Sequence, residues 1–268
     1  MADIRIYQID AFADALFTGN PAAVCVLDAW LPQATLQAIA AENNLSETAF
    51  IVRADDGWTL RWMTPETEVA LCGHATLASG YVVFTHLDPA AERVVFHTKS
   101  GPLVVEREDD QLAIDLPASR PSRLPDDHPL ARAVAAAIGR PATELWSARK
   151  AMAVLESESD VRALRPDMAL VAALDAFGLI VTAPGDESGV DFVSRFFAPA
   201  VGVPEDPVTG AAHCVLTPYW AERLDKRELR ARQVSRRGGA LLCRERGDRV
   251  TLVGRAVEYL EGRLRVES

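Results

Sequence analysis

Two long apolar segments interrupt an otherwise mixed pattern of hydrophobic and polar positions. CGHATLASGYVVF occupies residues 72–84 and TGAAHCVLTPYW occupies residues 209–220, and neither contains Asp, Glu, Lys or Arg. A helix that is apolar on all sides is buried within other structure rather than lying on a surface. We therefore predict one buried helix that begins at Gly73 and another that begins at Gly210.

Around these segments the pattern is typical of strands joined by turns, with a few amphipathic helices. Helical spacing predicts helices at 32–42, 130–139 and 161–174. Short apolar or alternating runs predict strands at 4–12, 22–27, 45–52, 59–65, 92–108, 111–117, 151–156, 177–184, 191–199 and 233–266. Residues 117–129, PASRPSRLPDDHP, contain four prolines and show no periodicity, which is typical of a linker. We therefore predict two domains, at residues 1–118 and 119–268.

The two halves share an order of features that predicts an internal duplication. In each half a predicted strand ends in a proline, Pro65 or Pro199, and an acidic stretch follows before the glycine that opens the apolar run. The spacing differs slightly between the halves, so the repeat is degenerate. Two similar halves predict a pseudo-twofold arrangement with a cleft between them.

Composition and charge narrow the range of partners. The 268 residues are 49% hydrophobic and carry a formal net charge of −10, which argues against a nucleic-acid surface and against binding to anionic membranes. The apolar runs are too short to span a bilayer. The four cysteines form no CxxC pair and no signal-like segment opens the chain, so we expect reduced thiols and a cytoplasmic protein.

The starts of the two predicted helices are candidate anion sites. The first N–H groups of a helix lack intrahelical partners, and the helix dipole adds positive potential there. Gly73 and Gly210 present no side chain that would keep a carboxylate away from those amides. The alternative is that both glycines simply permit close packing.

Four motifs together resemble the PhzF-like family of phenazine-biosynthesis isomerases and their relatives. These are GNPAAV, ENNLSETAF, PETEVALCGHATLASG and GVPEDPVTGAAHCVLTPYW, and the resemblance covers nearly the whole chain. It implies an α/β, diaminopimelate epimerase-like fold, in which each of two pseudo-symmetric halves wraps a curved, mostly antiparallel sheet around a central apolar helix. It also implies a homodimer and a cofactor-independent isomerase that moves a proton between carbons of a small carboxylate-bearing substrate, such as a trans-2,3-dihydro-3-hydroxyanthranilate.

The resemblance assigns roles to particular residues. Glu47, in NNLSETAF, occupies the family's acid/base position, and a carboxyl group in a closed apolar setting holds its proton more readily, as that role requires. The residues at the family's substrate pocket are Gly73, His74, Asp206, Gly210 and Ala211. Many relatives have Ser where this chain has Ala211, which removes a hydroxyl contact. From the residues alone, Asp206 could equally cap the second helix.

Several alternatives remain open on the sequence. In diaminopimelate epimerases a cysteine at each helix start moves the proton, whereas this chain has Cys72 at the first start and Thr209 at the second. The rivals are therefore an epimerase or racemase that uses Cys72, and a non-catalytic carboxylate-binding protein. Cys72, His74, His213 and Cys214 are zinc-ligand types without a common ligand spacing, and there is no nucleotide-binding glycine motif. We expect neither a metal nor a cofactor.

Overall fold

The computed structural model describes residues 2–266, which form two compact units. Unit 1 comprises residues up to 116 together with the segment from 251 onward, and unit 2 comprises residues 117–250. The predicted second half ran to residue 268, whereas the last strand, β18, pairs along its length with β1 in unit 1. Strand pairing between opposite ends of a chain leaves no mark in local sequence pattern, so the return of the C-terminal segment was not foreseen.

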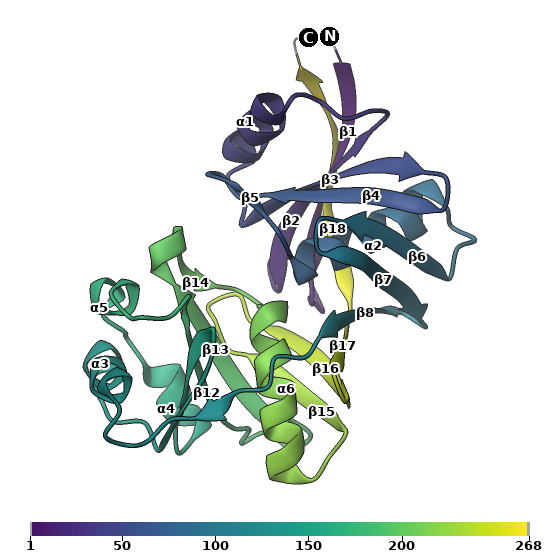
Figure 1. Cartoon of the computed structure of the whole chain (residues 1–268). Helices are drawn as coiled ribbons and strands as arrows, with labels where there is room; N and C mark the ends of the chain where they lie inside the picture. The colour runs from purple at the N-terminus through teal and green to yellow at the C-terminus, as the bar shows by residue number, and fades with distance from the viewer. Residues whose placement is uncertain (1, 267–268) are drawn as a thin grey trace. The chain divides into compact units, whose positions relative to one another are not determined.

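Unit 1 contains a central helix, α2, among strands, and Figure 1 labels its helices and strands. In chain order they are β1 (Ala2–Ala11), β2 (Asn20–Leu27), α1 (Gln33–Asn43), β3 (Glu47–Ala54), β4 (Gly57–Met63), β5 (Glu68–Val69), α2 (Gly73–Val82), the π-helical turn η1 (Val83–Leu87), β6 (Arg93–Thr98), β7 (Gly101–Glu108), β8 (Gln111–Pro117) and β18 (Ala256–Val266).

Unit 2 contains a second central helix and three shorter ones. Its elements are β9 (Ser122–Arg123), α3 (Pro129–Ile138), β10 (Glu144–Ala148), β11 (Lys150–Val154), α4 (Glu158–Ala163), α5 (Met168–Ala172), β12 (Leu179–Pro184), β13 (Phe192–Ala198), the 3-10 turn η2 (Pro199–Val201), β14 (Val203–Asp206), α6 (Gly210–Leu224), β15 (Glu228–Gln233), β16 (Gly239–Arg246) and β17 (Arg249–Gly254), in which the chain returns to unit 1.

The two units pair their strands in the same order, which confirms the predicted duplication and fold class. In unit 1, β2 is parallel to β3, β3 is antiparallel to β4, β4 is parallel to β6, and β6 is antiparallel to β7. In unit 2, β11, β12, β13, β15 and β16 repeat this series of pairings. The long helix enters at the same step in both units, α2 between β5 and β6 and α6 between β14 and β15.

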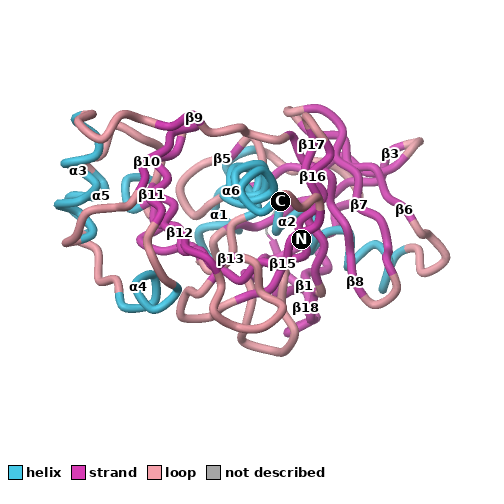
Figure 2. Tube along the Cα trace, turned by 90° about the horizontal axis from the view of Figure 1, so that it is seen from below, coloured by secondary structure: helices cyan, strands magenta, loops and turns pink. Residues whose placement is uncertain are grey.

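Both central helices, α2 and α6, are buried, as their apolar sequences predicted. Every residue of α2 except Tyr81 is buried, and the helix contacts β1, β2, β3 and β7. In α6 the buried residues are Gly210 and 212–221, and the helix contacts β15 and β16 (Figures 1 and 2). Gly80 lets α2 approach β7 closely, because a Cβ at this position would lie 2.7 Å from Cγ1 of Val105.

The helix predicted at 161–174 was wrong as a single element. The structure has two short helices, α4 and α5, which are separated by residues 164–167, including Pro166. Proline has no N–H to donate within a helix and disfavours the helical conformation of the residue before it. The side chain of Asp167 then caps α5 by accepting hydrogen bonds from the N–H groups of Ala169 and Leu170.

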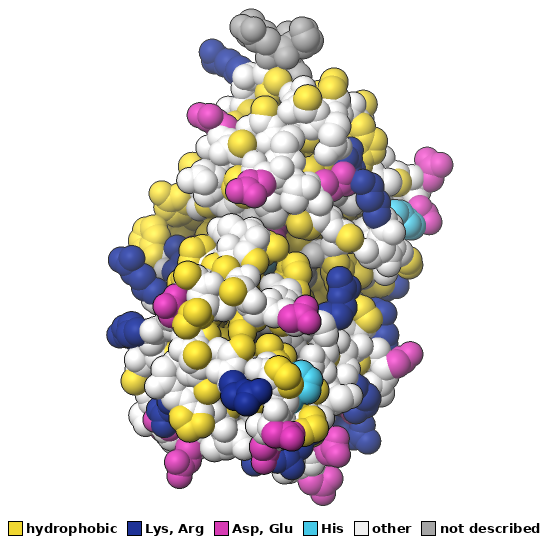
Figure 3. Space-filling model, turned by 60° about the vertical axis from the view of Figure 1, so that its left-hand side comes forward, with side chains coloured by type: hydrophobic (Ala, Val, Ile, Leu, Met, Phe, Trp, Pro, Cys, Tyr) yellow, Lys and Arg dark blue, Asp and Glu magenta, His cyan; other side chains and the backbone are white. Residues whose placement is uncertain are grey.

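The surface shows charges of both signs. On the face in Figure 3, acidic and basic side chains are interspersed with hydrophobic ones, so neither sign dominates that face. Among residues 2–266, no helix combines the length and the apolar character needed to cross a membrane.

Candidate functional site

The structure brings Glu47 and His74 together in unit 1. Glu47 is the first residue of β3, directly after the turn that ends α1, and His74 is the second residue of α2. Oε2 of Glu47 lies 3.3 Å from Nε2 of His74, and the Glu47 side chain is 18% exposed. This distance is short enough for a hydrogen bond, but the two groups are not aligned to form one. Catalytic contacts are often loosely aligned until a substrate is bound.

His74 is held from its other side as well. Its Nδ1 lies 3.3 Å from the amide nitrogen of Asn20 and 3.5 Å from Sγ of Cys72. The side chain is buried, and burial lowers the pKa of His74 to about 3. The imidazole is therefore neutral at physiological pH, so its contact with Glu47 is not an ion pair.

Asn20 is a site residue that the sequence prediction missed. It lies in the GNPAAV motif, where it begins β2 and is completely buried. The turn itself is at Gly19, whose φ of 64° is in the left-handed region. The signal in the sequence was an asparagine between a glycine and an apolar strand. At such a position the side chain is easily buried, and a buried amide needs hydrogen-bonding partners.

Cys72 stands at the start of α2 and is buried. Together with Glu47 and His74 it places one ligand-type atom from each residue within 4.8 Å of the others, a set that could hold a metal ion. The sequence instead grouped Cys72 and His74 with His213 and Cys214 as possible zinc ligands. His213 and Cys214 lie in α6 of unit 2, where Nδ1 of His213 donates to the carbonyl oxygen of Thr209 at 2.8 Å. The absence of a metal stays a prediction.

In unit 2 the segment before α6 forms a second polar cluster. The Thr209 hydroxyl donates to Oδ2 of Asp206 at 2.5 Å. The buried Gln233 joins both residues: its Oε1 accepts from the Thr209 N–H at 2.9 Å, and its Nε2 donates to the Asp206 carbonyl oxygen at 2.7 Å. Thr209 is the N-cap of α6 and its own side chain makes no capping hydrogen bond, so within the described part of the chain the cap position belongs to Thr209 and not to Asp206.

Gln233 is the second residue that the sequence prediction missed. It ends β15, in which exposed and buried residues alternate, and it occupies an inward position. An amide at an inward position of an alternating strand is the pattern that indicates a buried polar contact. Gln233 thus holds the loop from which α6 starts.

The two glycines predicted to bind a carboxylate begin the helices predicted for them, and their binding role stays a prediction. Gly73 and Gly210 are each the first residue of their helix, and neither helix has a side-chain cap among the described residues. Gly210 is buried and Ala211 is partly exposed. The predicted cleft that would join the two helix starts stays a prediction.

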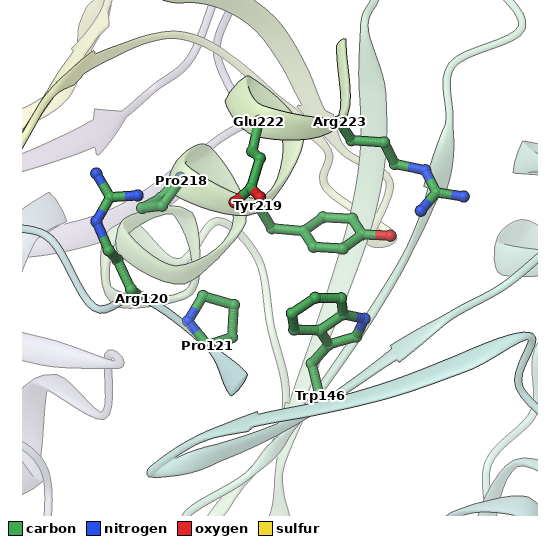
Figure 4. Close-up of a pocket in the computed structure, with 7 residues that line it drawn as sticks. All are labelled: Arg120, Pro121, Trp146, Pro218, Tyr219, Glu222 and Arg223. Atoms are coloured by element: carbon green, nitrogen blue, oxygen red, sulfur yellow. The ribbon is translucent and has the colours of Figure 1, made fainter. Parts of the chain in front are cut away.

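A pocket of about 380 Å³ in unit 2 contains none of the predicted site residues (Figure 4). Trp146 and Tyr219 form its aromatic corner, with ring centroids 5.2 Å apart. Their polar groups both donate to Oε2 of Glu144, at 2.9 and 3.1 Å, and Arg223 pairs with the other oxygen of that carboxylate at 2.7 Å. These groups already satisfy one another, so we assign the pocket no part in the chemistry.

A profile of the phenazine biosynthesis-like protein family matches residues 9–262. The chain belongs to this PhzF-like family. An uncharacterized isomerase of Pseudomonas aeruginosa is 52% identical over 98% of this chain and 99% of the relative. The mouse phenazine biosynthesis-like domain-containing protein 1 is 42% identical over 97% of this chain and 99% of that protein. The family predicted from the four sequence motifs is confirmed, and this PhzF-like protein is an enzyme of the isomerase class.

Solved structures confirm the fold of the PhzF-like chain. A PhzF family protein from Enterococcus faecalis matches with a TM-score of 0.94 and 45% identity, covering 99% of this chain and 100% of that one. A probable proline racemase from Agrobacterium radiobacter matches with a TM-score of 0.63 over 98% of this chain and 93% of that one. The racemase is only 10% identical, so it shows the shared epimerase-like fold alone.

Proposed function

We propose that this PhzF-like isomerase moves a proton between carbons of a small carboxylate-bearing metabolite, with Glu47 as the proton carrier. The observation that supports this role most directly is the contact between Oε2 of Glu47 and the neutral, buried imidazole of His74 at 3.3 Å. An imidazolium at this position would hold the carboxylate in its charged form. A neutral imidazole leaves Glu47 able to accept a proton and to return it.

Each helix start is a candidate site for the substrate's carboxylate. Gly73 and Gly210 provide backbone N–H groups at the positive ends of two buried helices, and among the described residues no side chain caps either end. In unit 2, Asp206 is the candidate acceptor for an amine or hydroxyl of the substrate, and Gln233 and Thr209 hold it in place. Ala211 adds no hydroxyl, so the backbone provides the polar contacts there. A dihydro-hydroxyanthranilate is one substrate with these groups.

A second candidate function is an epimerase in which Cys72 takes part. Sγ of Cys72 lies 3.5 Å from Nδ1 of His74 at the N-terminus of α2, and a helix N-terminus favours a thiolate. A neutral imidazole beside a thiol could accept its proton, as in other cysteine nucleophiles. This arrangement would place proton transfer on the sulfur instead of the carboxylate.

Two substitutions separate these functions. With a small cyclic or acyclic carboxylate that the wild-type enzyme turns over, Glu47→Gln should lower kcat by about a hundredfold or more, because an amide cannot accept the proton, while ligand affinity and thermal stability stay close to wild type. Cys72→Ala should be far milder. Glu42→Gln, on the exposed side of α1, is the matched control. Proton NMR in deuterated water would follow exchange at the substrate carbons, with and without a chelator, and no chelator effect is expected.

The opposite ranking would exclude Glu47 as the carrier. If Glu47→Gln stays within about threefold of wild type while Cys72→Ala is inactive, the epimerase takes its place. If the wild-type protein binds small carboxylates but exchanges a carbon-bound proton in none of them, the proton-transfer proposal fails.

A further inference from the structure

A neutral imidazole carries one proton, and its neighbours decide which nitrogen holds it. This choice matters at His74, because one ring nitrogen faces Glu47 and the other faces Asn20 and Cys72. If Nε2 is protonated, His74 offers an N–H to the Glu47 carboxylate. If Nδ1 is protonated, His74 offers a lone pair that repels the carboxylate.

The Asn20 amide is the neighbour that decides the tautomer. Its NH₂ group lies 3.3 Å from Nδ1 and can only donate, whereas the Cys72 thiol, at 3.5 Å, can donate its S–H or accept weakly at its sulfur. An Nδ1 that accepts from the amide cannot itself hold the proton. The Asn20 contact therefore favours the tautomer with the proton on Nε2, which is the nitrogen 3.3 Å from Oε2 of Glu47.

The backbone fixes Asn20 in this position. Asn20 is completely buried at the start of β2 and pairs with Ala11 across the β1–β2 ladder. The preceding Gly19 has a φ of 64°, and a Cβ there would lie 2.3 Å from the Ala11 carbonyl oxygen. Any residue with a Cβ would clash at position 19. The glycine turn therefore fixes where β2 begins, and with it the position of Asn20 beside the His74 ring.

We infer that Asn20 is a positioning residue, which holds His74 in the Nε2–H tautomer so that the ring nitrogen nearest the Glu47 carboxylate carries the proton. The inference rests on the proposed function, since an N–H on that side of the ring serves Glu47. Asn20 acts through His74, as the residue that orients a catalytic histidine does in other acid/base sites.

The test combines NMR with kinetics. In protein labelled with ¹⁵N-histidine, long-range ¹H–¹⁵N spectra distinguish a protonated ring nitrogen from an unprotonated one, and a His74→Gln variant identifies the His74 signals. We expect Nε2 of His74 to be protonated and Nδ1 unprotonated in the wild type. Asn20→Asp replaces the donor with an acceptor, so Nδ1 should become protonated. Asn20→Leu removes the donor at similar volume, so the Nε2–H tautomer should lose its dominance.

The kinetic expectation follows from the tautomer. Asn20→Asp should lower kcat by at least about tenfold with a smaller change in KM, since a wrong tautomer can cost up to about ten-thousandfold in a comparable site. Asn43→Asp is the matched control, because the Asn43 amide donates to the Thr48 hydroxyl and not to a histidine. It should leave the His74 spectrum and kcat unchanged.

Two results would overturn the inference. One is a wild-type spectrum with the proton on Nδ1 of His74. The other is an Asn20→Asp or Asn20→Leu enzyme that has lost the Nε2–H signal and yet keeps kcat within about threefold of wild type. Failure of the proposed function looks different: Glu47→Gln would remain active while the wild-type spectrum still shows Nε2–H and its dependence on Asn20.

Discussion

Glu68 makes the ion pairs that hold the short strand β5, and this strand ends three residues before Cys72, the N-cap of α2. Arg61 on β4 donates from Nε and from Nη2 to the two Glu68 oxygens, both at 2.9 Å, and Lys99 donates to Oε2 at 2.7 Å. β5 contains only Glu68 and Val69, so few ladder hydrogen bonds hold it. The hydrogen bonds from Arg61, followed by that from Lys99, lower the pKa of Glu68 from its ordinary value of 4.5 to about 2.

This pKa change sets the expected size of the stabilisation. The difference between 4.5 and about 2 corresponds, at about 1.36 kcal/mol per pH unit, to an upper limit of roughly 3 kcal/mol. The Glu68 side chain is only 14% exposed, but that of Lys99 is 64% exposed, and solvent screens such a partner. We therefore expect Glu68→Gln to lower the free energy of unfolding by about 1–2 kcal/mol at pH 7.

The pH dependence has a definite sign. The folded-state pKa of Glu68 is depressed, so its stabilisation is complete above about pH 5 and is lost as the pH falls from 4.5 toward 2. Urea unfolding of wild type and Glu68→Gln at pH 7, 5, 4 and 3 would measure the difference, which should fall below half of its pH 7 value by about pH 3. Glu66→Gln, at an exposed position two residues earlier, is the control. A difference that stays constant with pH, or one equal to that of the control, would refute the assignment.

Two further substitutions test the packing of α2 against β7 and the support of the loop before α6. Gly80→Ala should destabilise the protein by about 1–3 kcal/mol in urea unfolding, because its Cβ would lie 2.7 Å from Cγ1 of Val105. Adding Val105→Ala should recover part of this loss, and a double variant whose destabilisation equals the sum of the two single ones would contradict the clash. Gln233→Leu should lower the free energy of unfolding by about 1–3 kcal/mol, because the buried Thr209 N–H and the Asp206 carbonyl oxygen lose their partner. It should also raise KM more than it lowers kcat, and an unchanged KM would show that Asp206 does not bind the substrate.

The sequence predicted the parts of the fold that depend on local pattern. The helices at Gly73 and Gly210 followed from apolar runs without charge, and the duplication followed from the order of features around them. The single helix at 161–174 failed because the apolar periodicity continued across Pro166, which the backbone cannot follow. The pairing of β18 with β1 was not predictable either, because its partner lies at the other end of the chain.

The candidate site divides in a similar way. Glu47 and His74 were placed by resemblance, and the structure shows that they touch, although 26 residues separate them in sequence. Asn20 and Gln233 were missed because the sequence does not show what a side-chain amide contacts. The alternation in β15 indicates an inward position for Gln233, but only the contacts with Nδ1 of His74 and with the backbone before α6 assign the two amides to the site.

The duplication also favours one proton carrier over two. Both units place a long buried helix at the same step of the same strand order, but the residues at the helix starts differ in chemistry. In unit 1 the N-cap is Cys72, beside His74 and within 4.8 Å of Glu47. In unit 2 the N-cap is Thr209, whose hydroxyl donates to Asp206 and accepts from Gln233. An aliphatic hydroxyl engaged on both sides is a poor base, so a symmetric two-base epimerisation lacks its second partner. A duplicated scaffold with chemistry in one half suits a carboxylate that takes a proton from one carbon and returns it to another.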